Sequence, residues 1–414
     1  MYGKTAWLPP GFQYLLAGNL AQKSGRMSWI ASLPARVFVL GLVLCAPSVF
    51  GKMTSGPNIL LAADEISALA ESVQKSNEAA AMLRAMREDA DRYLAAPPPT
   101  VVSNGGQGDE HGYYTELPYC GWFNFWGLWG DSCRDGEINP DADREDYNQA
   151  RRMARETVVL ALTFRLLGEA DYGHAAARNI RVWTIDSDKY LRPQFTTSQS
   201  YIELCVTQIA TIYAISLLWE TDLFSATERG AIESWVAQWG NSIESWQRSN
   251  NFEDWRIAMR LAIYGFTGNA NKRHIAVSDF KRRIKEVVGD QGELLQELNR
   301  TKSLEYSLFA LNAMAHSAEI ARHQGIDLYN YTDERGVGLK KIFDYHLPFA
   351  MEKRSTQWPF PQSQDIAASD VAVYELAFSR YGDPDYLDLI QRWGRPLIEI
   401  RTFQYISLSH GSPY

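Results

Sequence analysis

Apolar residues recur at helical spacing along most of the chain after residue 144. Ala154, Val158, Leu162 and Leu166 are each four residues apart, which places their side chains on one face of a helix. No run of alternating apolar and polar residues is convincing enough to indicate a strand. The pattern therefore predicts an all-α protein.

Short turns that contain glycine separate the predicted helices. Residues 168–172 read Gly-Glu-Ala-Asp-Tyr, residues 382–386 read Gly-Asp-Pro-Asp-Tyr, and residues 268–271 hold a weaker copy, Gly-Asn-Ala-Asn. A helix-turn-helix unit that recurs along a chain is typical of folds that stack hairpins. We therefore expect an (α/α) toroid, or incomplete α/α barrel, of helical hairpins rather than an α/β enzyme.

The N-terminal region has the layout of a secretory signal peptide. Arg36 precedes the apolar run Val37 to Cys45, and small and turn-forming residues follow as far as Gly51. The run is shorter than the roughly 20 apolar residues that a membrane span needs. We expect residues 1–51 to form the signal peptide region, with Met27 as an alternative start. The mature protein is then periplasmic or secreted and has no membrane segment.

Two further segments precede the helical repeats. Residues 62–95 favour one helix rich in Ala, Glu and Arg, which the prolines at 97–99 end. From 100 to about 143 the chain is rich in Gly, Tyr, Trp and Pro, and a loop this long in a compact domain is usually a lid or a binding loop. We expect residues 52–112 to form an N-terminal helix and lid segment, and residues 113–400 to form the toroid domain.

Charge and aromatic content limit the classes of ligand. The net charge of −8 argues against a nucleic-acid-binding protein, which normally has a basic surface. An anionic sugar polymer stays compatible, because a cleft needs positive charge only locally. The chain has 13 Trp and 21 Tyr, whose rings either stack on sugars or fill the core.

Several classes of enzyme lack their characteristic motif in this chain. The sequence has no phosphate-binding loop, no dinucleotide-binding glycine motif, no Gly-x-Ser-x-Gly and no His-Glu-x-x-His. The seven histidines include no close pair at the spacing of zinc ligands. We therefore expect no required metal and no cofactor.

Polar residues gather at the start of two predicted helices. One cluster runs from Ser249 to Arg256 and the other from Glu297 to Tyr306. Within the first cluster, Asn250 and Asn251 could either bind a ligand or form an N-cap and turn.

The motifs in these segments resemble the alginate lyase superfamily of polysaccharide lyases. The matching stretches come in the family order and cover roughly residues 113–390; they are Arg134 to Pro140, Asn250-Asn251, Glu297 to Tyr306, Gly325 to Tyr329, and Trp358 to Gln362. The resemblance implies an (α/α) toroid whose long cleft binds an anionic polysaccharide. It also implies that a uronate-containing polymer is cleaved by β-elimination, which leaves unsaturated uronate ends.

The resemblance assigns three catalytic residues. Asn251 would neutralise the uronate carboxylate, Arg300 would stabilise negative charge, and Tyr306 would act as base and acid. A tyrosine phenol has an unperturbed pKa of about 10, so the phenolate needs a nearby cation. Because Arg300 lies six residues before Tyr306, we expect it to reach the site from the loop or first turn before the helix.

The chain departs from the family pattern at one position. Phe252 stands where the family has a histidine, and a phenyl ring neither takes up nor donates a proton. The protein would then handle one stereochemistry only, use Glu253, Asp254 or His316 in another way, or be inactive. The two acidic residues could instead fix Arg256 or Arg300, and His316 fits a core histidine better than a base.

Further residues are candidates for substrate binding or for structural support. The substrate-binding candidates are Asn250, Trp255, Trp122, Trp126, Trp129, Trp358 and Gln362. The three tryptophans at 122–129 either line sugar subsites or pack within their own loop. For Trp358 and Gln362 we expect structural support of the cleft wall rather than direct contact with the glycan. Cys120 and Cys133 flank this loop and form either a disulfide or two free thiols.

Two other functions fit parts of the sequence. A catalytically impaired homologue could keep the cleft and bind an anionic glycan during exopolysaccharide export or assembly, with Phe252 as the cause of lost activity. A glycoside hydrolase would need two acidic residues facing each other across the cleft, and Asp254 and Glu305 are candidates.

Overall fold

The computed structural model describes residues 57–104, 109–117, 139 and 141–411 of the 414-residue chain. In these residues the regular structure is helical, and extended pairing is limited to four isolated β-bridges. The helices are α1 (Ala63–Lys75), α2 (Asn77–Leu94), the 3-10 helix η1 (Val101–Asn104), α3 (Glu145–Leu167), α4 (Ala170–Thr184), α5 (Ser198–Leu218), α6 (Ala226–Ile243), α7 (Asn250–Phe266), α8 (Ala270–Val287), α9 (Ser303–His323), α10 (Leu339–Ala350), α11 (Ala368–Val371), α12 (Tyr374–Tyr381), α13 (Pro384–Trp393) and α14 (Ile406–His410). The predicted all-α class is confirmed for the described residues.

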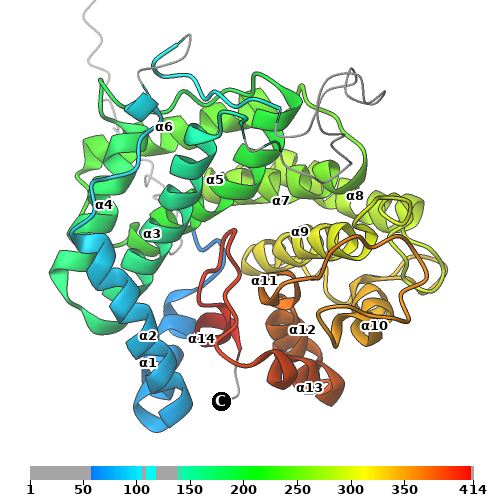
Figure 1. Cartoon of the computed structure of the whole chain (residues 1–414). Coiled ribbons are helices and arrows are strands. Elements are labelled where there is room, and N and C mark those ends of the chain that lie inside the picture. Colours follow the sequence, from blue (N-terminus) through cyan, green and yellow to red (C-terminus); the bar gives the residue numbers. More distant parts are fainter. Residues whose placement is uncertain (1–56, 105–108, 118–138, 140, 412–414) are drawn as a thin grey trace, which may run out of the picture. The chain divides into compact units, whose positions relative to one another are not determined.

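Four long helices form a continuous inner row. α3 packs against α5, α5 against α7, and α7 against α9, so alternate helices along the chain are neighbours (Figure 1). The helices between them lie outside this row: α4 packs on α3 and α5, α6 on α7, and α8 on α7. This alternation of inner and outer helices is the hairpin arrangement expected from the repeated turns.

The inner row is strongly apolar. Helix α5 is long and apolar enough by composition to cross a membrane, but 94% of its most apolar window is buried inside the protein. Every residue from Gln199 to Ile215 is buried. A helix that is hydrophobic all round is expected at the centre of a large helical domain. α5 is therefore a core helix, enclosed by α3 and α7.

The three predicted glycine turns each end one helix and lead into the next. Gly168, Gly268 and Gly382 have φ angles of 72°, 68° and 64°, in the left-handed region that residues with a Cβ rarely adopt. The following helix begins two residues later in each case, at Ala170, Ala270 and Pro384. The sequence prediction of these turns is confirmed.

The segment 62–95 forms two helices rather than the single helix that was predicted. α1 ends at Lys75 and α2 begins at Asn77, and Ser76 between them has extended backbone angles. The Ser76 hydroxyl accepts a hydrogen bond from the backbone N–H of Ala79 at 3.3 Å, which caps α2. Serine at this position therefore starts a new helix where the apolar pattern alone continues one.

The N-terminal helices pack with the C-terminal end of the chain. The Tyr405 hydroxyl donates a hydrogen bond to Asp89 of α2 at 2.7 Å, and His410 Nε2 lies 2.8 Å from the carbonyl oxygen of Leu60. Residues 53–414 accordingly form one compact unit. The predicted signal peptide region lies outside the described residues.

Candidate active site

A cavity of about 1020 Å³ opens at one end of the inner row. The N-terminal halves of α3, α5, α7 and α9 all contribute to its wall, together with the loop at 400–401. Its lining residues are Asn139, Ala142, Asp143, Arg144, Glu145, Tyr147, Asn148, Arg151, Gln199, Ile202, Glu203, Val206, Thr207, Asn250, Asn251, Phe252, Arg300, Lys302, Glu305, Tyr306, Phe309, Ile400 and Arg401. Helix N-termini carry partial positive charge and unpaired N–H groups, so this wall favours an anionic ligand.

Asn251 is held by a glutamate from the segment before α9. Its backbone N–H donates to Glu297 Oε1 at 2.8 Å, and its side-chain Nδ2 donates to Glu297 Oε2 at 3.0 Å. Both residues are only 1% exposed. Burial raises the pKa of Glu297 to about 7, although the contacts with Asn251 and Arg300 lower it. Asn251 thus lies at the cavity wall in a fixed orientation.

Asn250 shapes the turn that starts α7. Its φ of 53° is in the left-handed region, which asparagine tolerates better than most residues. Its side-chain Oδ1 accepts a hydrogen bond from the backbone N–H of Phe252 at 3.1 Å, and its carbonyl oxygen accepts one from Arg283 at 3.0 Å. The turn interpretation is therefore correct for the Asn250 side-chain oxygen, whereas the N-cap position of α7 is held by Ser249; Asn250 also lines the cavity.

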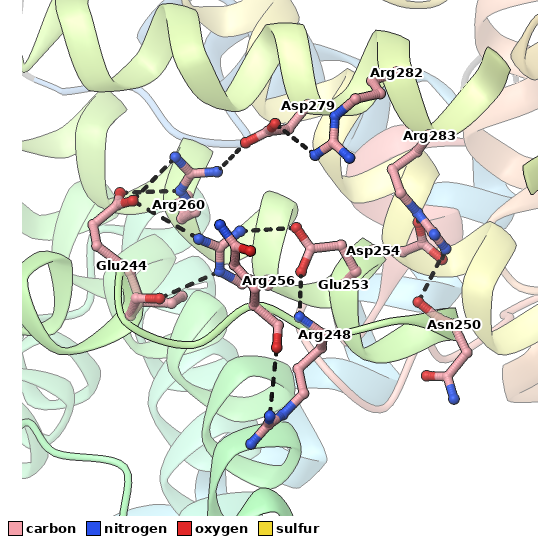
Figure 2. Close-up of polar contacts among 12 residues, drawn as sticks. Glu244, Arg248, Asn250, Glu253, Asp254, Arg256, Arg260, Asp279, Arg282 and Arg283 are labelled. Atoms are coloured by element: carbon pink, nitrogen blue, oxygen red, sulfur yellow. Dashed lines mark hydrogen bonds and ion pairs between the residues drawn. The ribbon is translucent and has the colours of Figure 1, made fainter. Parts of the chain in front are cut away.

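Buried ion pairs lie within α7 and between α7 and α8 (Figure 2). Asp254 receives two hydrogen bonds from Arg283, at 2.8 and 3.0 Å, and Glu253 receives one from Arg256 at 2.8 Å. Burial raises the pKa values of Asp254 and Glu253, and the paired arginines oppose this rise. The expected pairing of Glu253 with Arg256 is confirmed. Asp254 pairs with Arg283 rather than with Arg256 or Arg300, because α8 lies on that side of α7.

Arg300 and Tyr306 lie against each other at the start of α9. The guanidinium carbon of Arg300 is 3.9 Å from the centre of the Tyr306 ring. Arg300 Nη1 also lies 3.5 Å from Glu297 Oε2, the oxygen that accepts the Asn251 side chain. The three residues assigned to catalysis by resemblance are therefore brought to one wall of the cavity, and Glu297 connects two of them.

Phe252 and His316 lie in different environments. Phe252 lines the cavity, and its ring is stacked on Tyr201 with ring centres 6.5 Å apart. His316 is completely buried, with Nδ1 2.7 Å from the carbonyl oxygen of Asn312 and Nε2 3.5 Å from Glu399. The core interpretation of His316 is correct, and this histidine does not stand in for the one that Phe252 replaces.

Three of the expected substrate-binding residues, Trp255, Trp358 and Gln362, do not line the cavity. Trp255 is completely buried and packs on Phe309 and His316, so a sugar cannot contact it; this expectation was wrong. Trp358 is 7% exposed and donates through Nε1 to Ser303 at 2.7 Å. Gln362 Oε1 accepts a hydrogen bond from the backbone N–H of Leu304 at 2.9 Å.

Trp358 and Gln362 therefore fix the segment at 358–362 to the first turn of α9, as the cleft-wall interpretation predicted, and do not line the cavity. Trp122, Trp126, Trp129 and the pair Cys120 and Cys133 lie outside the described residues. Cys205 of α5 is a buried free cysteine.

The α5 part of the cavity lining contains residues that sequence reasoning missed. Glu203 of α5 is 3% exposed and accepts hydrogen bonds from Arg144 at 2.7 Å, Gln199 at 2.8 Å and Tyr113 at 2.8 Å. Burial raises the pKa of Glu203 against the effect of these donors. Arg144 and Glu203 are 59 positions apart, so no local motif indicates their contact.

The charges on the wall are mixed. The positively charged lining residues are Arg144, Arg151, Arg300, Lys302 and Arg401, and the acidic ones are Asp143, Glu145, Glu203 and Glu305. Asp254 is buried in its pair with Arg283 and does not line the cavity, so the acidic pair Asp254 and Glu305 required for a hydrolase is not formed. Among the described residues, no group of three His, Cys, Asp or Glu side chains could hold a metal ion.

Fold and cavity together define a helical toroid with a cavity at the N-terminal ends of its inner helices. The family model of alginate lyase matches residues 102–357. The chain therefore belongs to the alginate lyase family, as its motifs predicted. No curated protein matched the chain.

Solved structures agree with this assignment at the level of the fold. An alginate lyase from Bacteroides ovatus has a TM-score of 0.74 at 22% identity, over 86% of this chain and 100% of that chain. Alginate lyase A1-III from Sphingomonas species A1 has a TM-score of 0.66 at 17% identity, over 87% and 97%. A tyrosine-to-phenylalanine variant of A1-III, complexed with a tetrasaccharide, has a TM-score of 0.61 at 16% identity, over 86% and 98%. The predicted (α/α) toroid is confirmed by these similarities.

Proposed function

We propose that the protein is a polysaccharide lyase that cleaves a uronate-containing polymer by β-elimination. The observation that carries the proposal is the meeting of Asn251, Arg300 and Tyr306 on one wall of the cavity. The alginate lyase family and fold support activity on alginate-like polymers. Poly-mannuronate, glucuronan and a mixed exopolysaccharide are the substrates that this chemistry allows.

The proposed reaction removes the proton from C5 of the uronate and expels the oxygen on C4. An amide N–H of Asn251 binds the uronate carboxylate and so makes the C5 proton more acidic. Tyr306, as phenolate beside the Arg300 cation, takes the C5 proton while the C4–O bond breaks and a C4=C5 double bond forms. The phenol then returns a proton to the leaving oxygen, which becomes the hydroxyl of the new chain end.

Phe252 restricts the stereochemistry in this proposal. Its phenyl ring faces the cavity where the family has a titratable histidine, so Tyr306 has to serve both proton transfers. One phenol can reach both groups when the C5–H and C4–O bonds lie on the same face of the sugar. Mannuronate and glucuronate meet this condition and guluronate does not, so the proposal favours polymers of the first two.

The test is ultraviolet absorbance of the unsaturated product. Purified mature protein is incubated with poly-mannuronate, poly-guluronate, glucuronan and acetylated exopolysaccharides, with Tyr306→Phe as the control. We expect absorbance to rise with poly-mannuronate or glucuronan and to stay flat in the variant. A rise of equal size in the variant would remove Tyr306 from the mechanism.

A second function is favoured by Phe252 specifically. A homologue without the histidine could bind an anionic glycan without cleaving it and act in exopolysaccharide export or assembly. The same samples separate the two functions, since a binder gives a calorimetric signal and an intact polymer. A hydrolase would instead release reducing ends without unsaturation.

We also propose that the protein is exported and works in the periplasm or outside the cell. The apolar run after Arg36 supports this, and residues 113–400 would then form the working domain of the mature chain. Mass spectrometry of the N-terminus after expression in a secreting host tests the proposal. Cleavage near Gly51 supports export, and an intact N-terminus in the cytoplasm contradicts it.

A further inference from the structure

One buried carboxylate contacts two of the three proposed catalytic residues. Glu297 accepts hydrogen bonds from the backbone N–H and the side-chain Nδ2 of Asn251, at 2.8 and 3.0 Å. The oxygen that accepts Nδ2 also lies 3.5 Å from Arg300 Nη1. Arg300 in turn lies over the ring of Tyr306 at 3.9 Å. A chain of direct contacts thus runs from Asn251 to Tyr306 through Glu297.

The two bonds from Asn251 fix the orientation of its amide group. An amide nitrogen carries two protons, and the bond to Glu297 uses one of them. The backbone N–H of Asn251 is bound to the other carboxylate oxygen of Glu297. If the Asn251 amide turned over, its oxygen would face a Glu297 oxygen, and two acceptors would lie together. The remaining N–H of the amide is therefore available for a ligand carboxylate in the cavity that Asn251 lines.

We propose that Glu297 is the positioning residue of this site and that the site is active when Glu297 is ionised. A carboxylate accepts both donors of Asn251 and attracts Arg300, which keeps the guanidinium against Tyr306. A protonated Glu297 has to donate through one oxygen, and that oxygen would then face an N–H group. The inference rests on the proposed lyase function, which it extends to the regulation of the site by pH.

The charges around Glu297 decide the direction of the pH effect. Arg300 and Arg283 favour the ionised carboxylate, and Asp254 of α7 opposes it. Burial is the largest influence and raises the pKa of Glu297 to about 7. Activity is therefore expected to fall as the pH decreases through about 7, because the protonated fraction of Glu297 increases.

Glu297→Gln in the full chain is the main test. The variant keeps the size of the side chain and removes both the charge and one acceptor. We expect kcat to fall about tenfold to a hundredfold, because misplacement of the reacting groups by up to about 1 Å has effects of this size. KM should rise as well, because the Asn251 amide that binds the ligand carboxylate is no longer held in place. The decrease of kcat/KM below about pH 7 in the wild type should be absent in the variant.

Glu297→Asp and Glu375→Gln complete the design. Aspartate keeps a titrating carboxylate, so the acid decrease should persist at a lower kcat, and this variant serves if the glutamine variant does not fold. Glu375 is fully buried, bonded to Arg395 and Ser407, and outside the cavity. Glu375→Gln makes the same chemical change away from the cavity, so the decrease of kcat/KM below about pH 7 should remain in this variant.

A binding measurement separates this inference from the lyase proposal. Calorimetry with a saturated uronate oligosaccharide is done at about pH 6 and about pH 8 on the wild type and Glu297→Gln. We expect affinity to increase between the two pH values in the wild type only. If no polymer is cleaved but this difference is seen, the lyase proposal fails and the positioning role stands. Equal pH dependence of both proteins, in binding or in kcat/KM, overturns the role of Glu297.

Discussion

The guanidinium carbon of Arg300 lies over the ring of Tyr306, 3.9 Å from the ring centre. Six positions separate the two residues, which is not a spacing that brings side chains together on one helix. The contact forms because α9 begins only at Ser303, and Arg300 lies in the turn before it, where its N–H donates to the carbonyl oxygen of Glu297 at 3.1 Å. The expectation that Arg300 reaches Tyr306 from outside the helix is confirmed.

Arg300→Lys tests whether the planar guanidinium is required. Lysine keeps the charge but cannot lie flat on the ring and contact Glu297 at the same time. We expect kcat to fall about tenfold to a hundredfold for Arg300→Lys and further for Arg300→Ala, measured by product absorbance. Arg282→Ala, which changes an exposed arginine on α8, is the control and should keep the wild-type rate. Full activity of the lysine variant would contradict the proposed role.

Phe252→His tests whether the missing family histidine restricts the polymers that the protein cleaves. An imidazole with an ordinary pKa of about 6.5 would place a second proton-transfer group on α7, in the cavity that Tyr306 of α9 also lines. We expect cleavage of poly-guluronate to become detectable, because two separate groups can act on opposite faces of the sugar. Phe252→Leu is the matched control and should gain nothing. Loss of cleavage of all polymers in the histidine variant, with folding intact, would instead indicate that the phenyl ring itself supports binding.

Local sequence patterns predicted most of the fold. The inner helices are indicated by apolar residues three to four positions apart, and the turns by glycine motifs of four to five residues. Both patterns can be read from the sequence alone. The break at Ser76 was missed because the apolar pattern continues through it, and only the hydrogen bond from Ala79 makes the serine an N-cap. α5 lacks a polar face since α3, α4 and α7 pack around it.

The site could be predicted only in part, because its contacts join distant segments. Asn251 and Glu297 are 46 positions apart, and no spacing rule connects them. The prediction that Trp255 binds substrate was wrong for a related reason. Trp255 lies one turn after Asn251 on the same face of α7, but at this position Phe309 of α9 covers the face. The resemblance located Asn251, Arg300 and Tyr306, but their shared carboxylate became visible only in the structure.

The buried pair of Asp254 and Arg283 provides a test of how α7 is held. Asp254→Ala leaves the Arg283 charge buried without its partner, and such changes typically cost about 3–5 kcal/mol. Arg283 also holds the Asn250 carbonyl oxygen at 3.0 Å, so the start of α7 should shift and kcat should decrease. Urea unfolding and product absorbance measure the two effects.

A double variant, Asp254→Leu with Arg283→Met, separates stability from positioning. Replacement of both charges by apolar groups of similar size usually restores much of the lost stability. The bond to Asn250 is still missing, so we expect stability to recover and kcat to stay low. Recovery of both quantities together would show that Arg283 contributes to folding alone.

His346 gives the protein a stability that depends on pH. The residue is completely buried in α10, and burial lowers its pKa to about 4 from an ordinary value of 6.5. The unfolded chain therefore binds more protons than the folded protein between these values, and stability from this residue is lost as the pH falls from about 6.5 toward 4. Glu297, whose pKa is raised to about 7, acts in the opposite direction over part of this range.

The contribution of His346 must therefore be measured as a difference between two proteins. We expect the stability of the wild type relative to His346→Leu to decrease by on the order of 2 kcal/mol between neutral pH and about pH 4.5, from urea unfolding at each pH. Phe343→Leu is the matched control, since Phe343 is also fully buried on α10 but does not titrate. Its difference from the wild type should be the same at every pH. A constant difference for His346→Leu as well would mean that the histidine is solvated enough in the folded protein to accept a proton at its ordinary pKa.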